Sequence, residues 1–175
     1  MSCKYFYMNR HLLLYFCLCT FLGISVLCGC SNVPDKLKTA ESLMETAPDS
    51  AYHLLQKIKP GQLNTRSDKA FYALLMSQAL DKKNIQVESD SLIEIATDYY
   101  NDKDPVRAAY AWFYMSRCAN NRGNANIHAA ALLKAQEYAE QTDNYKLRGL
   151  VYGDKGIIYC NICSKLRNSI RFRCF

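Results

Sequence analysis

The sequence lacks the local motifs on which common catalytic sites are built. Its seven glycines form no glycine-rich loop of the kind that holds a phosphate, and no serine stands in a nucleophile elbow. His53 and His128 are far apart and have no carboxylate or thiol at the spacing of metal ligands. We therefore expect no enzyme, no metal site and no cofactor. Both histidines are expected to be surface or packed residues.

Net charge is also missing from the body of the chain. Of the formal charge of +6, the segment 1–29 carries +2 and the segment 164–175 carries +4, so the segment 30–163 is neutral. A basic groove for nucleic acid is therefore not expected. Asp90, Glu94 and Asp98 recur at a spacing of four and form an acidic stripe on a predicted helix. Such a stripe is either a solvated face or a contact for a basic partner.

A disulfide framework is absent although the chain has nine cysteines. Four lie at or before position 28 and three lie near the C-terminus, so only Cys30 and Cys118 remain between them. Cys160 and Cys163 form a CxxC pair that has neither a βαβ context nor a second pair for a zinc site. We interpret the pair as accidental or as an adventitious disulfide. A redox pair with a stabilised thiolate is the alternative.

One long apolar run is present, and it lies near the N-terminus. The run from Leu12 to Cys28 contains no charge and follows Arg10 and His11. A positive flank, an apolar core and small residues at its end are typical of a secretory signal peptide. An uncleaved signal anchor is the alternative, because a run of this length is at the lower limit for a membrane-spanning helix.

The end of this leader, Leu27-Cys28-Gly29-Cys30, resembles the lipobox of bacterial lipoproteins. The resemblance implies that residues 1–29 are a signal peptide, that Cys30 is lipidated and becomes the first mature residue, and that Cys28 leaves with the leader. Acyl chains on Cys30 would attach the protein to a membrane through a tether at residues 30–35. The expected location is the cell envelope, and Ser31 after the cysteine favours the outer membrane.

Beyond the leader, apolar residues recur at helical spacing and strand-like alternation is nowhere sustained, so we expect an all-α fold. Asp49 or Ser50 is expected to cap the second helix, Ser67 the third, and Asp104-Pro105 to start a long one. The expected helices span residues 37–44, 50–58, 67–82, 89–100, 105–121, 126–140 and 145–159.

The helical part repeats. Tyr72, Trp112 and Tyr152 are evenly spaced along the chain. Their period of about 40 residues corresponds to one helical hairpin, which cannot bury its apolar face alone and must stack on its neighbour.

The segment from Ala111 to Ala139 resembles the tetratricopeptide repeat, and the chain resembles lipid-anchored repeat proteins of Gram-negative bacteria. Trp112 stands at the first aromatic position, which packs between helices, and Met115-Ser116 replaces a Leu-Gly pair. His128 stands where a small alanine is usual. The resemblance implies a short right-handed α-solenoid. Its units would be a helical pair at 36–66, about two and a half repeats at 67–163 and a basic tail at 164–175.

The same resemblance places a partner-binding groove on the concave face of the first helix of each hairpin. Tyr110, Phe113, Arg117, Asn120 and Asn121 fall on this face. Arginine and asparagine there can hydrogen-bond a peptide backbone or carboxylate, and the aromatic residues supply apolar anchors. An ordinary exposed helix face is the alternative.

These features together predict a non-catalytic scaffold that binds a protein or peptide of unspecified identity. After Tyr159 the chain becomes basic and loses the repeat register, as a frameshifted or truncated end would. The expected result is an exposed apolar face with Leu150, Ile157 and Ile158. Two other functions remain open: the sensor part of a larger membrane-associated signalling or transcriptional regulator, and a glycan-binding nutrient lipoprotein of the outer membrane.

Overall fold

The computed structural model describes residues 32–171, and the side chains of 165, 166 and 168–171 are not described. The described residues form seven α-helices and one short 3₁₀ turn joined by loops, with no strand among them, which confirms the expected all-α class. The elements are α2 (Val33–Leu43), α3 (Pro48–Gln56), η2 (Pro60–Gln62), α4 (Arg66–Lys82), α5 (Ser91–Tyr100), α6 (Pro105–Asn121), α7 (Ala125–Glu140) and α8 (Tyr145–Arg171).

The predicted caps are right for α6 and wrong for α3 and α4. Asp104 caps α6, because its side chain accepts a hydrogen bond from the backbone N–H of Arg107. Thr65, and not Ser67, caps α4 in the same way. Pro48 begins α3 directly, because proline lacks an N–H and its fixed φ suits the first helical position.

The last helix is longer than the sequence pattern predicts. The repeat register ends near Tyr159, but α8 continues to Arg171. No proline or glycine follows Gly156, so nothing in the local sequence stops the helix. Loss of the repeat pattern therefore marks the end of packing rather than the end of the helix.

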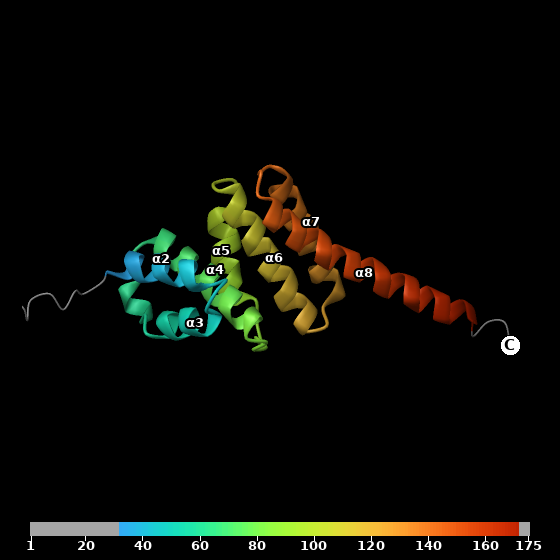
Figure 1. The fold of residues 1–175 in the computed structure, drawn as a ribbon, viewed down its shortest axis with the longest axis horizontal. Helices are drawn as coiled ribbons and strands as arrows, with labels where there is room; N and C mark the ends of the chain where they lie inside the picture. The colour runs from blue at the N-terminus through green and yellow to red at the C-terminus, as the bar shows by residue number, and fades with distance from the viewer. Residues whose placement is uncertain (1–31, 172–175) are drawn as a thin grey trace, which may run out of the picture. The chain divides into compact units, whose positions relative to one another are not determined.

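The first helices of successive pairs lie in a row (Figure 1). α2 contacts α4, α4 contacts α6, and α6 contacts α8. By contrast, α3, α5 and α7 contact mainly the helices that precede and follow them in the chain. This alternation places α2, α4, α6 and α8 along one side, which we call the inner face.

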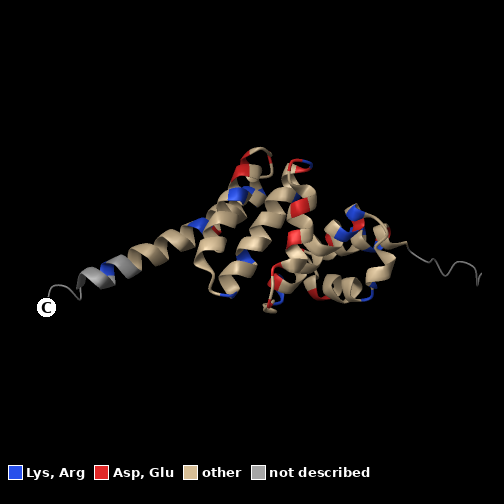
Figure 2. Cartoon of the chain, turned by 180° about the vertical axis from the view of Figure 1, so that it is seen from behind, with Lys and Arg blue, Asp and Glu red and all other residues tan. Residues whose placement is uncertain are grey.

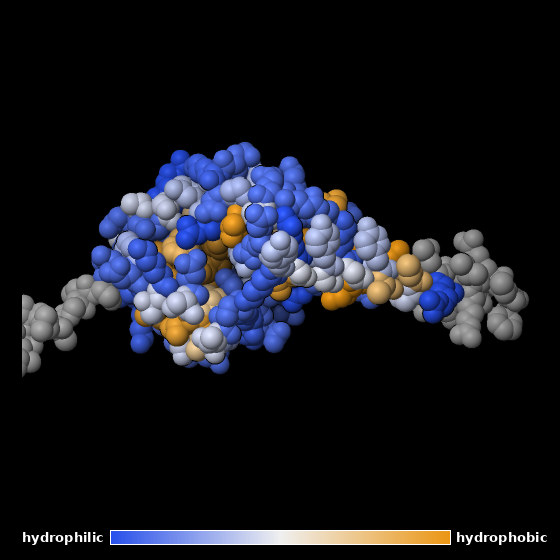
Figure 3. All heavy atoms as spheres, turned by 45° about the horizontal axis from the view of Figure 1, so that its top comes forward, coloured by the Kyte–Doolittle hydropathy of each residue, from blue (hydrophilic) through white to orange (hydrophobic). Residues whose placement is uncertain are grey.

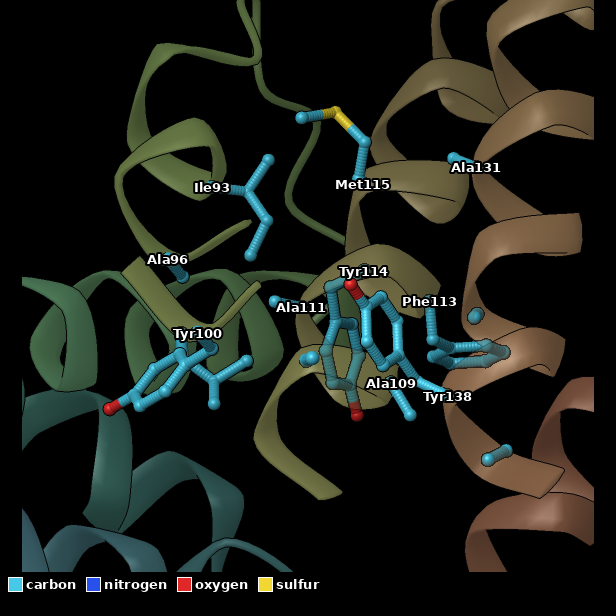
Figure 4. Packing of buried hydrophobic residues seen from close by; sticks show 14 of the residues in the cluster. Ile93, Ala96, Tyr100, Ala109, Ala111, Phe113, Tyr114, Met115, Ala131 and Tyr138 are labelled. Carbon is cyan, nitrogen blue, oxygen red and sulfur yellow. The ribbon is translucent and has the colours of Figure 1, made fainter. Parts of the chain in front are cut away.

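Two groups of buried side chains hold the helices together. One lies among α2, α3 and α4 and includes Leu37, Met44 and Leu55. The other joins α4 to α8 and is centred on α6, whose Phe113 and Tyr114 rings meet edge to face (Figure 4). Fully buried alanines on α6 and α7 leave room for close approach of the two helices.

The leader, Cys28, the proposed lipidation site Cys30 and the start of the 30–35 tether lie outside the described residues. Among the helices that are described, none has the length and apolar character needed to cross a membrane.

Candidate functional site

The inner face contains a groove of about 470 Å³ where α2, α4, α6 and the start of α8 meet. Its floor is apolar and is made by side chains with little exposed surface. Polar and charged side chains form its walls. The floor residues are Met44, Leu74, Leu75 and Val106, and the wall residues are Glu41, Glu45, Gln78, Asp104, Arg107, Tyr110 and Lys146.

Both basic residues of the groove are already paired with carboxylates. Lys146 on α8 lies 2.9 Å from Glu45 in the turn after α2. Arg107 lies 3.7 Å from Glu41 and 3.8 Å from Asp104, and its guanidinium stacks over the Phe71 ring. A ligand carboxylate would have to displace an existing partner, so the walls do not favour an acidic ligand.

The Glu45–Lys146 contact joins the two ends of the row of helices. The hydrogen bond from Lys146 is the main reason that the pKa of Glu45 lies below its usual value, and Lys82 adds to the effect at 3.3 Å. The carboxyl group is therefore charged at neutral pH and forms an ion pair between the turn after α2 and the first turn of α8.

A second group of ionic contacts joins three helices of the inner face. Arg117 on α6 lies 3.0 Å from Asp81 on α4 and 3.3 Å from Asp154 on α8. Burial lowers the pKa of the guanidinium, but the combined effect of the two carboxylates outweighs it, so the pKa lies above its usual value. One Arg117 side chain thus connects three inner-face helices.

The structure brings only part of the predicted groove together. Tyr110 lines the groove and stacks on Tyr114, with ring centroids 6.5 Å apart. Arg117 lies on the same face, but its hydrogen bonds go to Asp81 and Asp154. Burial raises the pKa of the Tyr110 hydroxyl, which is therefore a neutral donor and acceptor at physiological pH.

Phe113 is not exposed in the groove, where the sequence predicts that it serves as an apolar anchor for a partner. It is only 6% exposed and belongs to the core between α6 and α7. In Figure 4 its ring points toward α7. Asn120 and Asn121 are exposed at the C-terminal end of α6, outside the residues that line the groove. Partner binding by these residues stays a prediction.

The other residues noted in the sequence lie apart from the groove. Trp112 is half-buried at the edge of the core, and its Nε1 donates a hydrogen bond to Asn101 over 3.4 Å. Cys160 and Cys163 are free, exposed thiols in the interior of α8. They are far from the helix N-terminus whose dipole would stabilise a thiolate.

His53 and the acidic residues of the predicted stripe also lie outside the groove. His53 is exposed, and its ring lies 3.3 Å from the side chain of Gln56. Asp90 pairs with Arg122, whereas Glu94 and Asp98 are exposed on α5, where acidic segments follow one another (Figure 2). No group of three potential metal ligands occurs within the described chain.

His128 is accommodated by a partner on the neighbouring helix. It is buried on α7, and its Nδ1 lies 2.7 Å from the Ser116 hydroxyl oxygen on α6. Ser116 and His128 both depart from small residues of the repeat pattern, and they satisfy each other across the helix pair.

Several groove residues are not predicted from the sequence. Glu41, Met44 and Lys146 come from α2, its following turn and the start of α8, and single-helix periodicity does not show that these segments meet. The sequence indicates their position only through the alternation of first and second helices in successive hairpins, which places α2 and α8 on the same face as α6.

Comparisons with protein-family models, curated proteins and solved structures find no match to the chain.

Proposed function

We propose that the protein is a non-catalytic lipoprotein of the cell envelope that binds a protein or peptide segment in its inner-face groove. In this proposal the helices form a short right-handed solenoid of tetratricopeptide-like hairpins. Lipid on Cys30 attaches the chain to the outer membrane. The tether is shorter than the expected 30–35, because α2 already begins at Val33.

The row of α2, α4, α6 and α8 with its groove is the observation that carries the proposal. A concave surface built from several helices suits a segment of another protein, because each helix contributes contacts to a different part of that segment. Contacts among the groove's own charges support a preorganised surface, which lowers the cost of binding.

The groove chemistry favours a segment that presents an apolar side chain. The floor of Met44, Leu74 and Val106 can cover such a side chain, while Tyr110 and Gln78 provide a hydroxyl and an amide for the backbone of the segment. The paired cations leave no free positive charge in the groove for an acidic anchor.

Photo-cross-linking in the cell tests the binding surface. A photoreactive residue at Glu41, exposed on the groove wall, is expected to capture a discrete partner. The matched control is the same residue at Ile95, which is 45% exposed on α5. Equal capture at both positions, or none at Glu41, contradicts binding in the groove.

Metabolic labelling with a lipid precursor tests the attachment. We expect wild type and Cys28→Ser to be labelled and Cys30→Ser to lose the label, because only Cys30 supplies the thioether sulfur. Labelling that survives Cys30→Ser would contradict the anchor without bearing on the groove.

A further inference from the structure

A second, apolar hollow lies between α7 and α8, and it shares no lining residue with the inner-face groove. Its volume is about 200 Å³. Leu132 and Leu133 on α7 and Ile158, Tyr159 and Ile162 on α8 form most of its lining. Lys155 is the one charged residue among the lining side chains.

The hollow is open because no later helix within the described chain covers the outer side of α8. α4 packs with α5 and α6 with α7, whereas α8 packs mainly on α6 and α7. Leu133 and Tyr159 are each 59% exposed and Ile162 is 48% exposed. Hydrophobic side chains are visible along the part of α8 that extends past α7 (Figure 3). Exposed apolar side chains that gather around a hollow are a feature of interaction sites.

The shape of this surface fits a helix. Two packed helices present parallel ridges with a furrow between them, and a third helix can place its own side chains in that furrow. An amphipathic helix in an apolar groove is a common mode of peptide recognition. A bilayer surface has no ridge that would fill the hollow, so the geometry favours a helix over a membrane.

The charge around the hollow indicates which kind of helix. Among the described side chains of α8 from Lys155 onward, Lys155 and Arg167 are basic and none is acidic. In Figure 2 the described part of its far end shows one basic segment and no acidic one. Two copies of α8 brought together would place like charges side by side, whereas acidic flanks on a partner helix would complement them.

We propose that the α7–α8 hollow binds an amphipathic helix of a partner protein, with an apolar stripe facing Leu133 and Ile162 and acidic residues along its flanks. This surface is separate from the inner-face groove, so the chain would join two partners, or two segments of one partner.

Two synthetic helical peptides test this proposal against the full chain in phosphatidylcholine nanodiscs. Both carry the same leucine stripe at i, i+3, i+4 and i+7, and one has glutamates and the other lysines on its flanks. We expect the glutamate peptide to bind about tenfold or more tightly than the lysine peptide by fluorescence anisotropy, and the difference to shrink as salt is added.

Variants assign the binding to the hollow. Ile162→Glu is expected to lower the affinity for the glutamate peptide by about tenfold or more, and Ile162→Leu is expected to keep the wild-type affinity. Ile95→Glu, a change at a similarly exposed position on α5, is the matched control and should bind like wild type. Because Ile162 is exposed, the substitutions leave the folded core intact.

Three results would overturn the proposal. One is equal binding, or no binding, of the two peptides. Another is self-association of the full chain that Ile162→Glu abolishes, which would make a second copy the occupant. The third is Ile162-dependent binding to phosphatidylglycerol vesicles without binding of the glutamate peptide, which would make the surface a membrane contact.

Discussion

At the scale of single residues, chemical type is easier to predict than surroundings. Phe113 and Tyr110 are three positions apart on one helix, and the sequence predicts that both face a groove. The structure places Tyr110 in the groove wall and Phe113 in the core, because α7 covers one flank of α6. Helical spacing fixes the angle between two side chains, but the neighbouring helices decide which angle is open to solvent.

Ser116 and His128 illustrate the same limit. Each departs from a small residue of the repeat pattern, and the sequence alone does not show what surrounds His128. Their 2.7 Å contact makes them a matched pair. Only the register between α6 and α7 shows that the two positions meet.

Tyr100 offers a test of buried polarity. It is 3% exposed, and no hydrogen-bond partner for its hydroxyl occurs within residues 32–171. An unpaired buried hydroxyl costs about 1–3 kcal/mol. We expect Tyr100→Phe to raise the free energy of unfolding by about 1 kcal/mol at pH 7 in urea titrations. A clear loss of stability would contradict this reading of the site.

The same residue gives a pH dependence. Burial raises the pKa of Tyr100 from 10.0 to about 12. Ionisation of Tyr100 therefore leaves stability unchanged below pH 10, and stability falls as the pH rises from 10 to 12, because the unfolded state releases the proton first. In the Tyr100→Phe variant, the free energy of unfolding should fall less steeply between pH 10 and 12. Tyr159→Phe, at a 59% exposed position, is the control.

At the scale of elements, helices with strong sequence signals at their ends are predicted well. Asp104-Pro105 fixes the start of α6, and Gly123 ends the α6 segment with a φ of +74°. The end of α8 is predicted wrongly because repeat register and helix propensity disagree there. The repeat register indicates which part of a helix packs on its neighbours, whereas the helix propensity of the residues indicates where the helix ends.

The glycines within α8 give an element-scale prediction. A methyl group added at Gly153 would meet no atom within 4 Å, so Gly153→Ala changes helix propensity without a clash. We expect it to raise the free energy of unfolding by about 1 kcal/mol in urea titrations. Gly123→Ala is the contrasting variant and should lower it, because alanine is strained at that φ. If both variants changed the free energy of unfolding in the same direction, the described difference between the two glycine positions would be contradicted.

At the scale of the whole molecule, composition and periodicity are enough to predict the all-α class. They are also enough to predict that successive hairpins stack, an arrangement with which the α2–α4–α6–α8 row is consistent. They are not enough to predict the groove, since Glu45 and Lys146 lie far apart in the sequence and meet only when helices at both ends of the row are in place.

The central claim is that the inner face binds a partner, and the most direct measurement is the affinity of the partner captured at Glu41 for the full chain with Tyr110→Ala. Loss of this groove wall is expected to weaken binding by about tenfold, or about 1.4 kcal/mol, with Ile95→Ala as the unaffected control. A thermal melt should show that the variant remains folded. Unchanged affinity in the folded Tyr110→Ala variant would contradict the account.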